Sequence, residues 1–366
     1  MVDRRSIVDL WHRDSAQVLV TLVRIEGSSY RRPGAHLLIG PDGAEYAGTI
    51  SGGCLEAEVV RKASWFIASG PTVKRYSTLF DDTAEIPFGL GCGGVVDLLF
   101  ESADTPECQA LLRAMESSLT GDESRVATWL PENGSRFARA IFNAAGELIF
   151  ASPTLGARDL DAARSGGAGI YTEHLTGPQR LFLLGAGDDV KPVAKMAGLL
   201  GWRVFVVDGR PQLAKPERFP EAERVFTISS AAELNLRSND AVVLMTHSYE
   251  QDRTFLAGLL SASQVPGYIG LLGASHRSAL LVSEAAAMIG STVATCCERV
   301  WAPVGLDLGG DGAEAIALAV IGEVHAWREG KLPAARRLTP ERVAEQIAKG
   351  GASRYLRTQC AVGASE

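Results

Sequence analysis

The sequence has little of what marks a membrane-spanning, disulfide-bonded or nucleic-acid-binding protein. No run reaches the ~18 consecutive apolar residues of a transmembrane helix, and the first apolar run, 18–23, is too short for a signal-peptide core. Six cysteines scattered over 366 residues are too few for a disulfide framework and indicate reduced thiols. The net charge is -7, whereas a domain that binds phosphate backbones is usually basic. We therefore expect a cytoplasmic protein with no membrane span and no nucleic-acid partner.

Signatures of a metal site or of a thiol-dependent hydrolase are also missing from the sequence. There is no Cys-x-x-Cys and no His-x-x-x-His, and the adjacent Cys296 and Cys297 cannot easily bind one tetrahedral ion. No local nucleophile signature accompanies the thiols, so a papain-like Cys–His enzyme is unsupported. From these patterns we assign no metal ligand and no catalytic residue.

What the sequence does have is the composition of a globular protein with an excess of glycine. Hydrophobic residues make up 46% and charged residues 22%, so the chain can bury a core. Glycine occurs 39 times in 366 residues, against a usual ~7%. Because the excess falls in short clusters, it predicts backbone turns that approach ligands.

Two regions of the chain carry different hydrophobic patterns. In residues 17–101, strands are expected at 18–24, 36–39 and 95–100, and an amphipathic helix at 55–67. From Gln179 onward, short apolar strands alternate with helices, which is typical of a parallel sheet covered on both faces. These strands are expected at 181–184, 204–207, 225–228, 241–245 and 268–272. The predicted fold class is α/β: a small N-terminal α+β domain and a C-terminal Rossmann-like doubly wound parallel-sheet domain.

The same patterns suggest the domain boundaries. A chain of this length favours two or three domains at ~100–200 residues each. We place the N-terminal domain at 1–115 and a connecting segment, with short strands and a glycine-rich linker at 165–169, at 116–177. The Rossmann-like domain is expected at 178–330 and a C-terminal tail at 331–366.

A nucleotide-type loop follows the first strand of the second region. Gly185 and Gly187 form a Gly-x-Gly between strand and helix, and Asp208 ends the next strand. In dinucleotide-binding folds such glycines approach a pyrophosphate and the acidic residue binds a ribose. Here the third glycine is missing, and Asp188 and Asp189 put carboxylates where a phosphate would lie. Three interpretations stay open: a phosphate-bearing ligand, hydride-transferring NAD(P), or a domain kept for its architecture.

His247 follows the strand 241–245, at the sheet edge where such folds bind ligands. It is a candidate for hydrogen bonding to a ligand or for proton transfer. Alternatively, its neighbours Thr246, Ser248 and Asp252 satisfy the amides at the start of the next helix. The sequence favours neither interpretation.

Two cysteines lie among glycines. Cys54 follows Gly52 and Gly53 at the start of the helix expected at 55–67, where the helix dipole and free amides would stabilise a thiolate. Cys92 lies between Gly91 and Gly93, in a loop whose amides can form an anion nest. The alternative for a lone cysteine is a small buried hydrophobe. That is our expectation for the other four, Cys108, Cys296, Cys297 and Cys360.

In combination and order, these motifs resemble the xanthine dehydrogenase accessory family of the XdhC/CoxI type. The resemblance rests on residues 26–35, 48–56 and 91–94 in the front half, and on 184–187, 207–210, 246–252, 268–273 and 303–307 in the rear half. It implies a non-enzymatic maturation factor, not a dehydrogenase. Such a protein binds the molybdenum cofactor as cargo and protects it from oxidation. It presents the cofactor for sulfuration by a cysteine desulfurase and inserts it into a xanthine dehydrogenase-type molybdenum hydroxylase.

The resemblance also implies a set of cofactor-binding residues. A pterin with a terminal phosphate suits glycine nests, and its metal–dithiolene end suits a thiol, for which Cys92 is the first choice and Cys54 the second. The full candidate set is Gly52, Gly53, Cys54, Gly91, Cys92, Gly93, Gly185, Gly187, Asp208 and His247. We expect these residues of both halves to face one cavity, and the protein to form a homodimer. The alternative function is an NAD(P)-binding oxidoreductase that uses the Rossmann-like domain.

Overall fold

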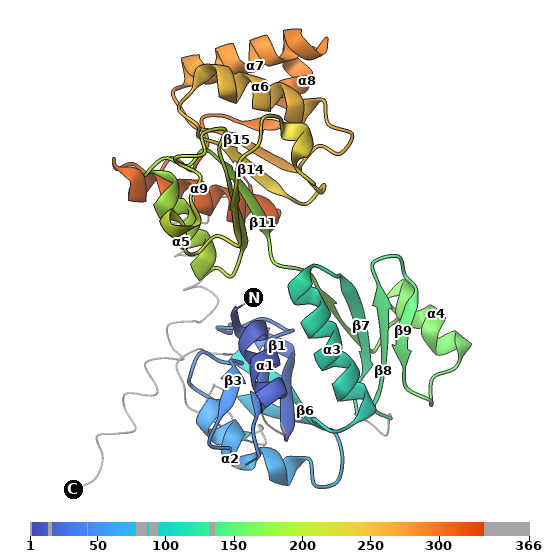
Figure 1. Ribbon diagram of the computed structural model, residues 1–366. Coiled ribbons are helices and arrows are strands. Elements are labelled where there is room, and N and C mark those ends of the chain that lie inside the picture. The colour runs from blue at the N-terminus through green and yellow to red at the C-terminus, as the bar shows by residue number, and fades with distance from the viewer. Residues whose placement is uncertain are drawn as a thin grey trace, which may run out of the picture. The chain divides into compact units, whose positions relative to one another are not determined.

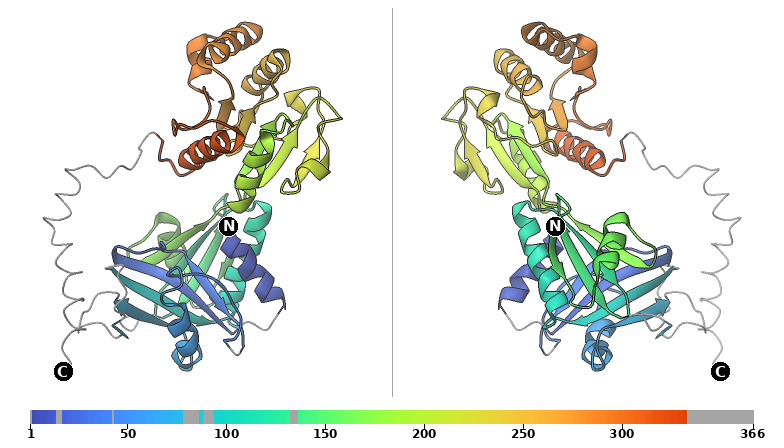
Figure 2. Two further views of the ribbon diagram at one scale, coloured as in Figure 1. Left: turned by 90° about the vertical axis from the view of Figure 1, so that its left-hand side faces the viewer. Right: turned by 90° about the vertical axis from the view of Figure 1, so that its right-hand side faces the viewer.

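The computed structural model describes residues 2–13, 17–41, 43–77, 86–87, 94–131 and 136–332. The chain divides into two compact units, the first running to Gly177 and the second beginning at Pro178. Figure 1 labels the helices and strands, and Figure 2 shows them from two further sides. Each unit is described by itself.

The first unit contains, within its described residues, a six-stranded and mainly antiparallel sheet in the order β3-β2-β1-β6-β4-β5. Its strands are β1 (Val18–Gly27), β2 (His36–Ile39), β3 (Tyr46–Gly48), β4 (Thr72–Ser77), β5 (Ile86–Pro87) and β6 (Gly94–Ser102). Side chains alternate along β1. Val18 and Val20 pack with α2 (Glu56–Phe66), while Leu19 packs with α1 (Val2–Arg13) and α3 (Pro106–Thr120). Helices therefore cover both faces of this sheet.

A second, four-stranded antiparallel sheet completes the described part of the first unit, in the order β10-β7-β8-β9. Its strands are β7 (Ser124–Trp129), β8 (Ala138–Asn143), β9 (Leu148–Ala151) and β10 (Ile170–Leu175). Helix α3 packs on one face and α4 (Ala157–Ser165) on the other. A fully buried ion pair joins the two sheets, because Arg139 of β8 donates to both carboxylate oxygens of Glu101 on β6, at 2.8 and 2.9 Å.

The second unit contains a parallel sheet in the order β13-β12-β11-β14-β15-β16 across its described residues. Its strands are β11 (Arg180–Leu184), β12 (Arg203–Val207), β13 (Arg224–Phe226), β14 (Ala241–Leu244), β15 (Tyr268–Leu271) and β16 (Val300–Trp301). In chain order this is 3-2-1-4-5-6, the order of dinucleotide-binding Rossmann folds. The strands are nearly all apolar because both faces are covered.

Helices lie on both faces of this parallel sheet, as Figures 1 and 2 show. Helices α5 (Val190–Leu199) and α9 (Ala313–Arg328) share one core cluster with the sheet. Helices α6 (Tyr249–Leu260) and α7 (Ser275–Ile289), with the short α8 (Val293–Cys297), share the other. Two 3-10 turns, η1 (Pro216–Arg218) and η2 (Ala231–Glu233), also belong to the described part of this unit. No helix within the described ranges is long and apolar enough to cross a membrane.

The predicted fold class is confirmed, with an N-terminal α+β unit and a Rossmann-like unit that begins after Gly177. The helices and strands that the sequence patterns did not predict are α1, β3, β4, β5, β9, α4, β10, α8 and β16. The stretch 116–177, expected to be a connecting segment with short strands, contains all four strands of the four-stranded sheet. Within it, the glycine-rich stretch 165–169 is not a linker between domains: Gly166, with φ of 73°, ends α4 and leads into β10.

Candidate functional site

The glycine turn before α2 folds around the carboxylate of Glu56. Oε1 accepts hydrogen bonds from the amides of Ile50 and Ser51, at 3.0 and 2.9 Å, and from Thr49 Oγ1 at 2.5 Å. Oε2 accepts from the amide of Gly53 at 2.9 Å and from the Ser51 hydroxyl. Only 3% of the Glu56 surface is exposed. The amide nest that the glycines create is therefore filled by a side chain of the same turn.

These hydrogen bonds keep Glu56 ionised. Burial by itself raises the pKa of the carboxyl group, because a charge is less stable away from water. Hydrogen bonds from Ser51 and Thr49 outweigh burial and bring the pKa to about 2, below the usual 4.5. The turn and its internal anion thus stabilise each other.

Gly52 and Gly53 serve this turn by their backbone conformation. Their φ values are +81° and +109°, a region that side chains with a Cβ rarely adopt. We expected free amides beside Cys54, but the turn uses them itself. The Gly52 amide donates to Thr49 Oγ1 at 2.9 Å, and the Leu55 amide donates to Ser51 Oγ at 2.8 Å.

Cys54 is exposed and lines a small pocket with a cavity volume of about 20 Å³. The other lining residues are Ser28, Ser29, Tyr30, Ile50, Ser51, Leu55 and Val96. A cavity of this size holds about one water molecule. The remaining front-half candidates, Gly91, Cys92 and Gly93, lie outside the described residues, as does Cys360.

Among the other described cysteines, Cys108 and Cys296 are buried, as expected, but the expectation was wrong for Cys297, which is exposed. It is the last residue of the short helix α8. Burial raises the pKa of the Cys108 thiol well above its usual value, and the neighbouring Glu101 charge adds to that effect. Cys108 is therefore an unreactive core residue.

The rear-half candidates gather where the chain order in the Rossmann-like sheet reverses. Strands β11 and β14 are neighbours, and the Gly185 loop follows β11 while His247 follows β14. Such a switch point is where open α/β sheets bind ligands. Gly185 has a φ of +132°, and a Cβ there would lie 2.3 Å from the carbonyl oxygen of Met245. Only glycine therefore allows the two loops to approach so closely.

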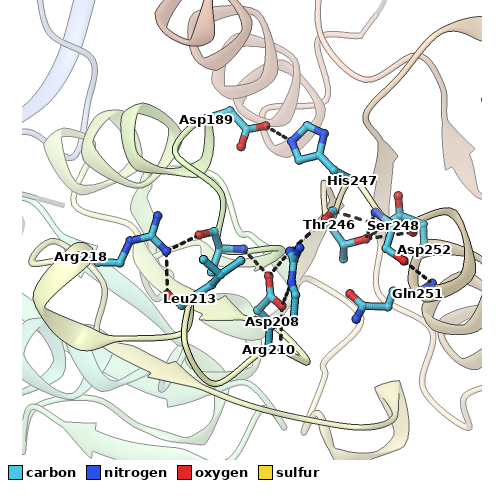
Figure 3. A network of polar contacts seen from close by, with 11 residues as sticks. Asp189, Asp208, Arg210, Leu213, Arg218, Thr246, His247, Ser248, Gln251 and Asp252 are labelled. Carbon is cyan, nitrogen blue, oxygen red and sulfur yellow. Dashed lines mark hydrogen bonds and ion pairs between the residues drawn. The ribbon is translucent and has the colours of Figure 1, made fainter.

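Asp208 is fully buried and its carboxylate is engaged within the protein. Oδ1 accepts from the amide and Nε of Arg210, and Oδ2 accepts from Arg210 Nη2 and the amide of Ala186, each at 2.8 Å. Burial raises the pKa of Asp208, but the bonds from Arg210 outweigh it and lower the pKa overall. Figure 3 shows this arrangement. In this conformation neither carboxylate oxygen is open to a ribose.

The two carboxylates of the loop have separate partners. Asp188 accepts from Arg218 Nη2 at 2.9 Å and pairs with Lys191 Nζ at 2.7 Å. Asp189 Oδ2 lies 2.8 Å from Nε2 of His247. The side chains of Asp189 and His247 point toward each other in Figure 3. A Cβ on Gly187 would lie 2.5 Å from Asp189 Oδ1 and 3.7 Å from His247 Cδ2, so this glycine makes room for the pair.

The helix-start interpretation is confirmed for the neighbours of His247, whereas a ligand or proton-transfer role for His247 itself stays a prediction. Ser248 caps α6, and Asp252 accepts from Thr246 Oγ1 at 2.7 Å and from Arg277 Nη2 at 2.7 Å. His247 takes no part in this capping. Its φ is +61°, which is unusual for a residue with a side chain, and the side chain is 61% exposed. The imidazole is thus held by Asp189 at the protein surface, beside the switch point of the sheet.

Within the described ranges, no cluster of three or more His, Cys, Asp or Glu side chains is arranged to hold a metal ion. The structure brings together Gly52, Gly53 and Cys54 in the first unit. It brings together Gly185, Gly187, Asp208 and His247 in the second. That both groups share one cavity stays a prediction. Sequence reasoning missed Glu56 and Tyr30, although an acidic residue directly after a glycine turn at a helix start was a usable signal for Glu56.

Two family models match this chain, one in each unit. The XdhC and CoxI family matches residues 10–77, which contain the Glu56 turn, and the XdhC Rossmann domain matches residues 181–324, which contain the Gly185 loop and His247. Together they span more than half of the 366 residues. The chain belongs to the XdhC and CoxI family. The resemblance drawn from the motifs is confirmed.

Alignments with similar proteins cover most of the chain. It is 29% identical over 327 residues to a probable xanthine dehydrogenase subunit of Bacillus subtilis (strain 168), covering 85% of this chain and 93% of that protein. It is 24% identical over 318 residues to the molybdenum cofactor insertion chaperone PaoD of Escherichia coli (strain K12), covering 85% and 83%. A crystal structure of a xanthine dehydrogenase from Bacillus halodurans matches with a TM-score of 0.76 and 26% identity, over 94% of this chain and 99% of that one.

Proposed function

We propose that this XdhC-family protein is a molybdenum cofactor chaperone for a xanthine dehydrogenase-type molybdenum hydroxylase. The observation that carries the proposal is the alignment of both units, over 85% of the chain, with a molybdenum cofactor insertion chaperone. The protein holds the cofactor as cargo, presents it for sulfuration by a cysteine desulfurase and delivers it to the hydroxylase. It acts in the cytoplasm and as a homodimer.

The geometry of the first unit supports a particular contact with this cargo. Glu56 fills the amide nest of the turn, so an anionic phosphate has no open site there. The exposed Cys54 thiol lines the neighbouring pocket. A soft thiol suits the metal–dithiolene end of the cofactor. Cys54 is therefore proposed at the metal end, together with Cys92 and its neighbours Gly91 and Gly93.

A reconstitution experiment tests the function and the site separately. The full chain is expressed in cells that make the cofactor, its molybdopterin content is measured, and transfer to a cofactor-free hydroxylase is followed by the activity of that enzyme. We expect Cys54→Ser and Cys92→Ala to lower loading and transfer, and Cys297→Ser, an exposed thiol of the second unit, to change neither. Wild-type protein that retains no molybdopterin would refute the proposed function. Normal loading of both variants would refute the site.

One observation favours the alternative, an NAD(P)-binding oxidoreductase. The strand order of the second unit is that of dinucleotide-binding domains. The engagement of Asp208 by Arg210 weighs against it, because the ribose contact would require breaking buried, charge-assisted hydrogen bonds. Calorimetry with NAD+ and NADPH on the full chain decides between them, and we expect no heat of binding.

A further inference from the structure

We infer that Tyr30 is the surface on which the flat ring system of the cargo stacks, across the mouth of the Cys54 pocket. This inference rests on the proposed function and assigns the pterin part of the cofactor to named residues. Tyr30 is 74% exposed although it lies in a well-packed unit, and it is one of the residues that line the pocket. An aromatic ring that is both exposed and fixed is a ready stacking surface.

The backbone of the Glu56 turn fixes one side of this ring. A Cβ on Gly52 would lie 2.6 Å from Tyr30 Cδ1 and 2.7 Å from Cε1, so the ring lies directly against the glycine. The turn itself is held by the hydrogen bonds to Glu56. Because the ring is already positioned, stacking on it costs little conformational entropy.

The size of the pocket determines how a ring can bind. A volume of about 20 Å³ admits about one water-sized group, so a bicyclic ring cannot enter. It can lie across the mouth against Tyr30 and insert a single polar substituent. The floor is apolar and buried, formed by Ile50, Leu55 and Val96.

The polar side of the pocket matches the edge of a pterin. Ser28, Ser29 and Cys54 line it, and serine hydroxyls both donate and accept hydrogen bonds. A pterin edge carries donors and acceptors side by side. The arrangement places the ring on Tyr30 and leaves the Cys54 thiol beside it for the metal end.

The test compares four full-length variants with a small fluorescent probe, pterin-6-carboxylate, and with molybdopterin loading. Tyr30→Ala is expected to raise the Kd of the probe by about tenfold or more, the loss seen when a stacking ring is removed from nucleobase sites. Tyr30→Phe should stay within about threefold of wild type because it keeps the ring. Gly52→Ala should weaken the probe as Tyr30→Ala does, because its Cβ displaces the ring. Tyr46→Ala, which removes an exposed tyrosine that does not line the pocket, should have no effect.

Circular dichroism and thermal unfolding verify that each variant is folded, and Tyr30→Leu serves in place of Tyr30→Ala if the latter is unstable. If wild type binds molybdopterin and Tyr30→Ala binds it and the probe equally well, this inference fails while the chaperone function stands. If wild type binds neither molybdopterin nor the probe, both fail. A loss with Tyr30→Phe as large as with Tyr30→Ala would show that the hydroxyl, not the ring, makes the contact, and would also overturn the inference.

Discussion

Replacing Glu56 with glutamine should loosen the turn that carries Cys54 and supports Tyr30. Glutamine keeps one oxygen acceptor but replaces the other carboxylate oxygen with an NH2 group. That NH2 group, itself a donor, then faces a backbone amide that donates to Oε1 or Oε2 in the wild-type protein. The substitution removes the charge from all five hydrogen bonds described above and leaves at least one buried donor without a partner. Its effect is local because the partners lie between residues 49 and 53.

The lowered pKa of Glu56 gives the size of the stability loss expected in Glu56→Gln. The fall from 4.5 to about 2 corresponds to at most about 3.5 kcal/mol, at ~1.4 kcal/mol for each pKa unit. Water near the turn screens part of this, so we expect a loss of about 2 to 3 kcal/mol at pH 7. Because the pKa in the folded protein is lowered, the contribution is complete above pH ~5 and disappears as the pH falls toward 2. At pH 3, wild type and variant should differ by only about 1 kcal/mol.

Amide hydrogen exchange of the full chain measures the local effect at pH 7. The amides of Ile50, Ser51 and Gly53 should exchange roughly 30- to 150-fold faster in Glu56→Gln, as a loss of about 2 to 3 kcal/mol requires. Urea unfolding at pH 7 and pH 3 measures the pH dependence. Exchange rates within twofold of wild type, or an equal loss of stability at both pH values, would refute this account of the turn.

Glu58→Gln is the matched control, two residues further along α2. Its carboxylate pairs with Arg61 and with Lys62 at 2.5 Å, both within α2 and outside the turn. The hydrogen bond with Lys62 lowers its pKa, with burial opposing. We expect this variant to leave the exchange of the turn amides unchanged.

Three further predictions concern other positions. Gly185→Ala should cost about 3 kcal/mol in urea unfolding or prevent folding, because its Cβ would lie 2.3 Å from the carbonyl oxygen of Met245. Iodoacetamide should modify Cys54 in the native protein and Cys108 only after unfolding, as peptide mass spectrometry will show, because only the first is exposed. Asp208→Asn should lower stability by about 2 kcal/mol at pH 7 and by less at pH 3, since its pKa is lowered in the folded protein.

Each of these predictions has its own control and a contradicting result. Gly290→Ala, where a Cβ meets open space, should cost about 1 kcal/mol, so an equal loss at Gly185 would contradict the steric argument. Native labelling of Cys108 would contradict its placement in the core. For Asp208→Asn, an increase in stability, or a loss that grows as the pH falls, would contradict the role of Arg210.

Much of the fold was predictable because hydrophobic periodicity is a local property. The strands at 36–39 and 181–184 and the helix at 55–67 appear close to their expected bounds. Elements with few apolar residues, such as α4, were missed because the first unit buries only Ala163 of that helix. The glycine motifs were recognised in the sequence. The hydrogen-bond partners of the side chains beside them, Glu56, Asp189 and Asp208, were not predicted.

Glu56 and His247 show two different reasons for what was missed. The partners of Glu56 lie within seven residues, so the filled nest was present in the sequence as an acidic residue directly after the turn. His247 and Asp189 are 58 residues apart, and nothing in either segment specifies the pair. Gly187 was predicted to let the backbone approach a phosphate, whereas in the structure it makes room for the Asp189–His247 pair.

The sequence alone determined the family, the parallel sheet of the second unit and the position of the glycine turns. These features depend on motifs and on hydrophobic periodicity, which are local properties of the sequence. Only the tertiary structure decided that Asp208 faces Arg210 and not a ligand, and that Tyr30 lies exposed against Gly52. The reason is physical: a charged or aromatic side chain takes the partner that folding brings within reach, and that partner depends on how separate segments pack.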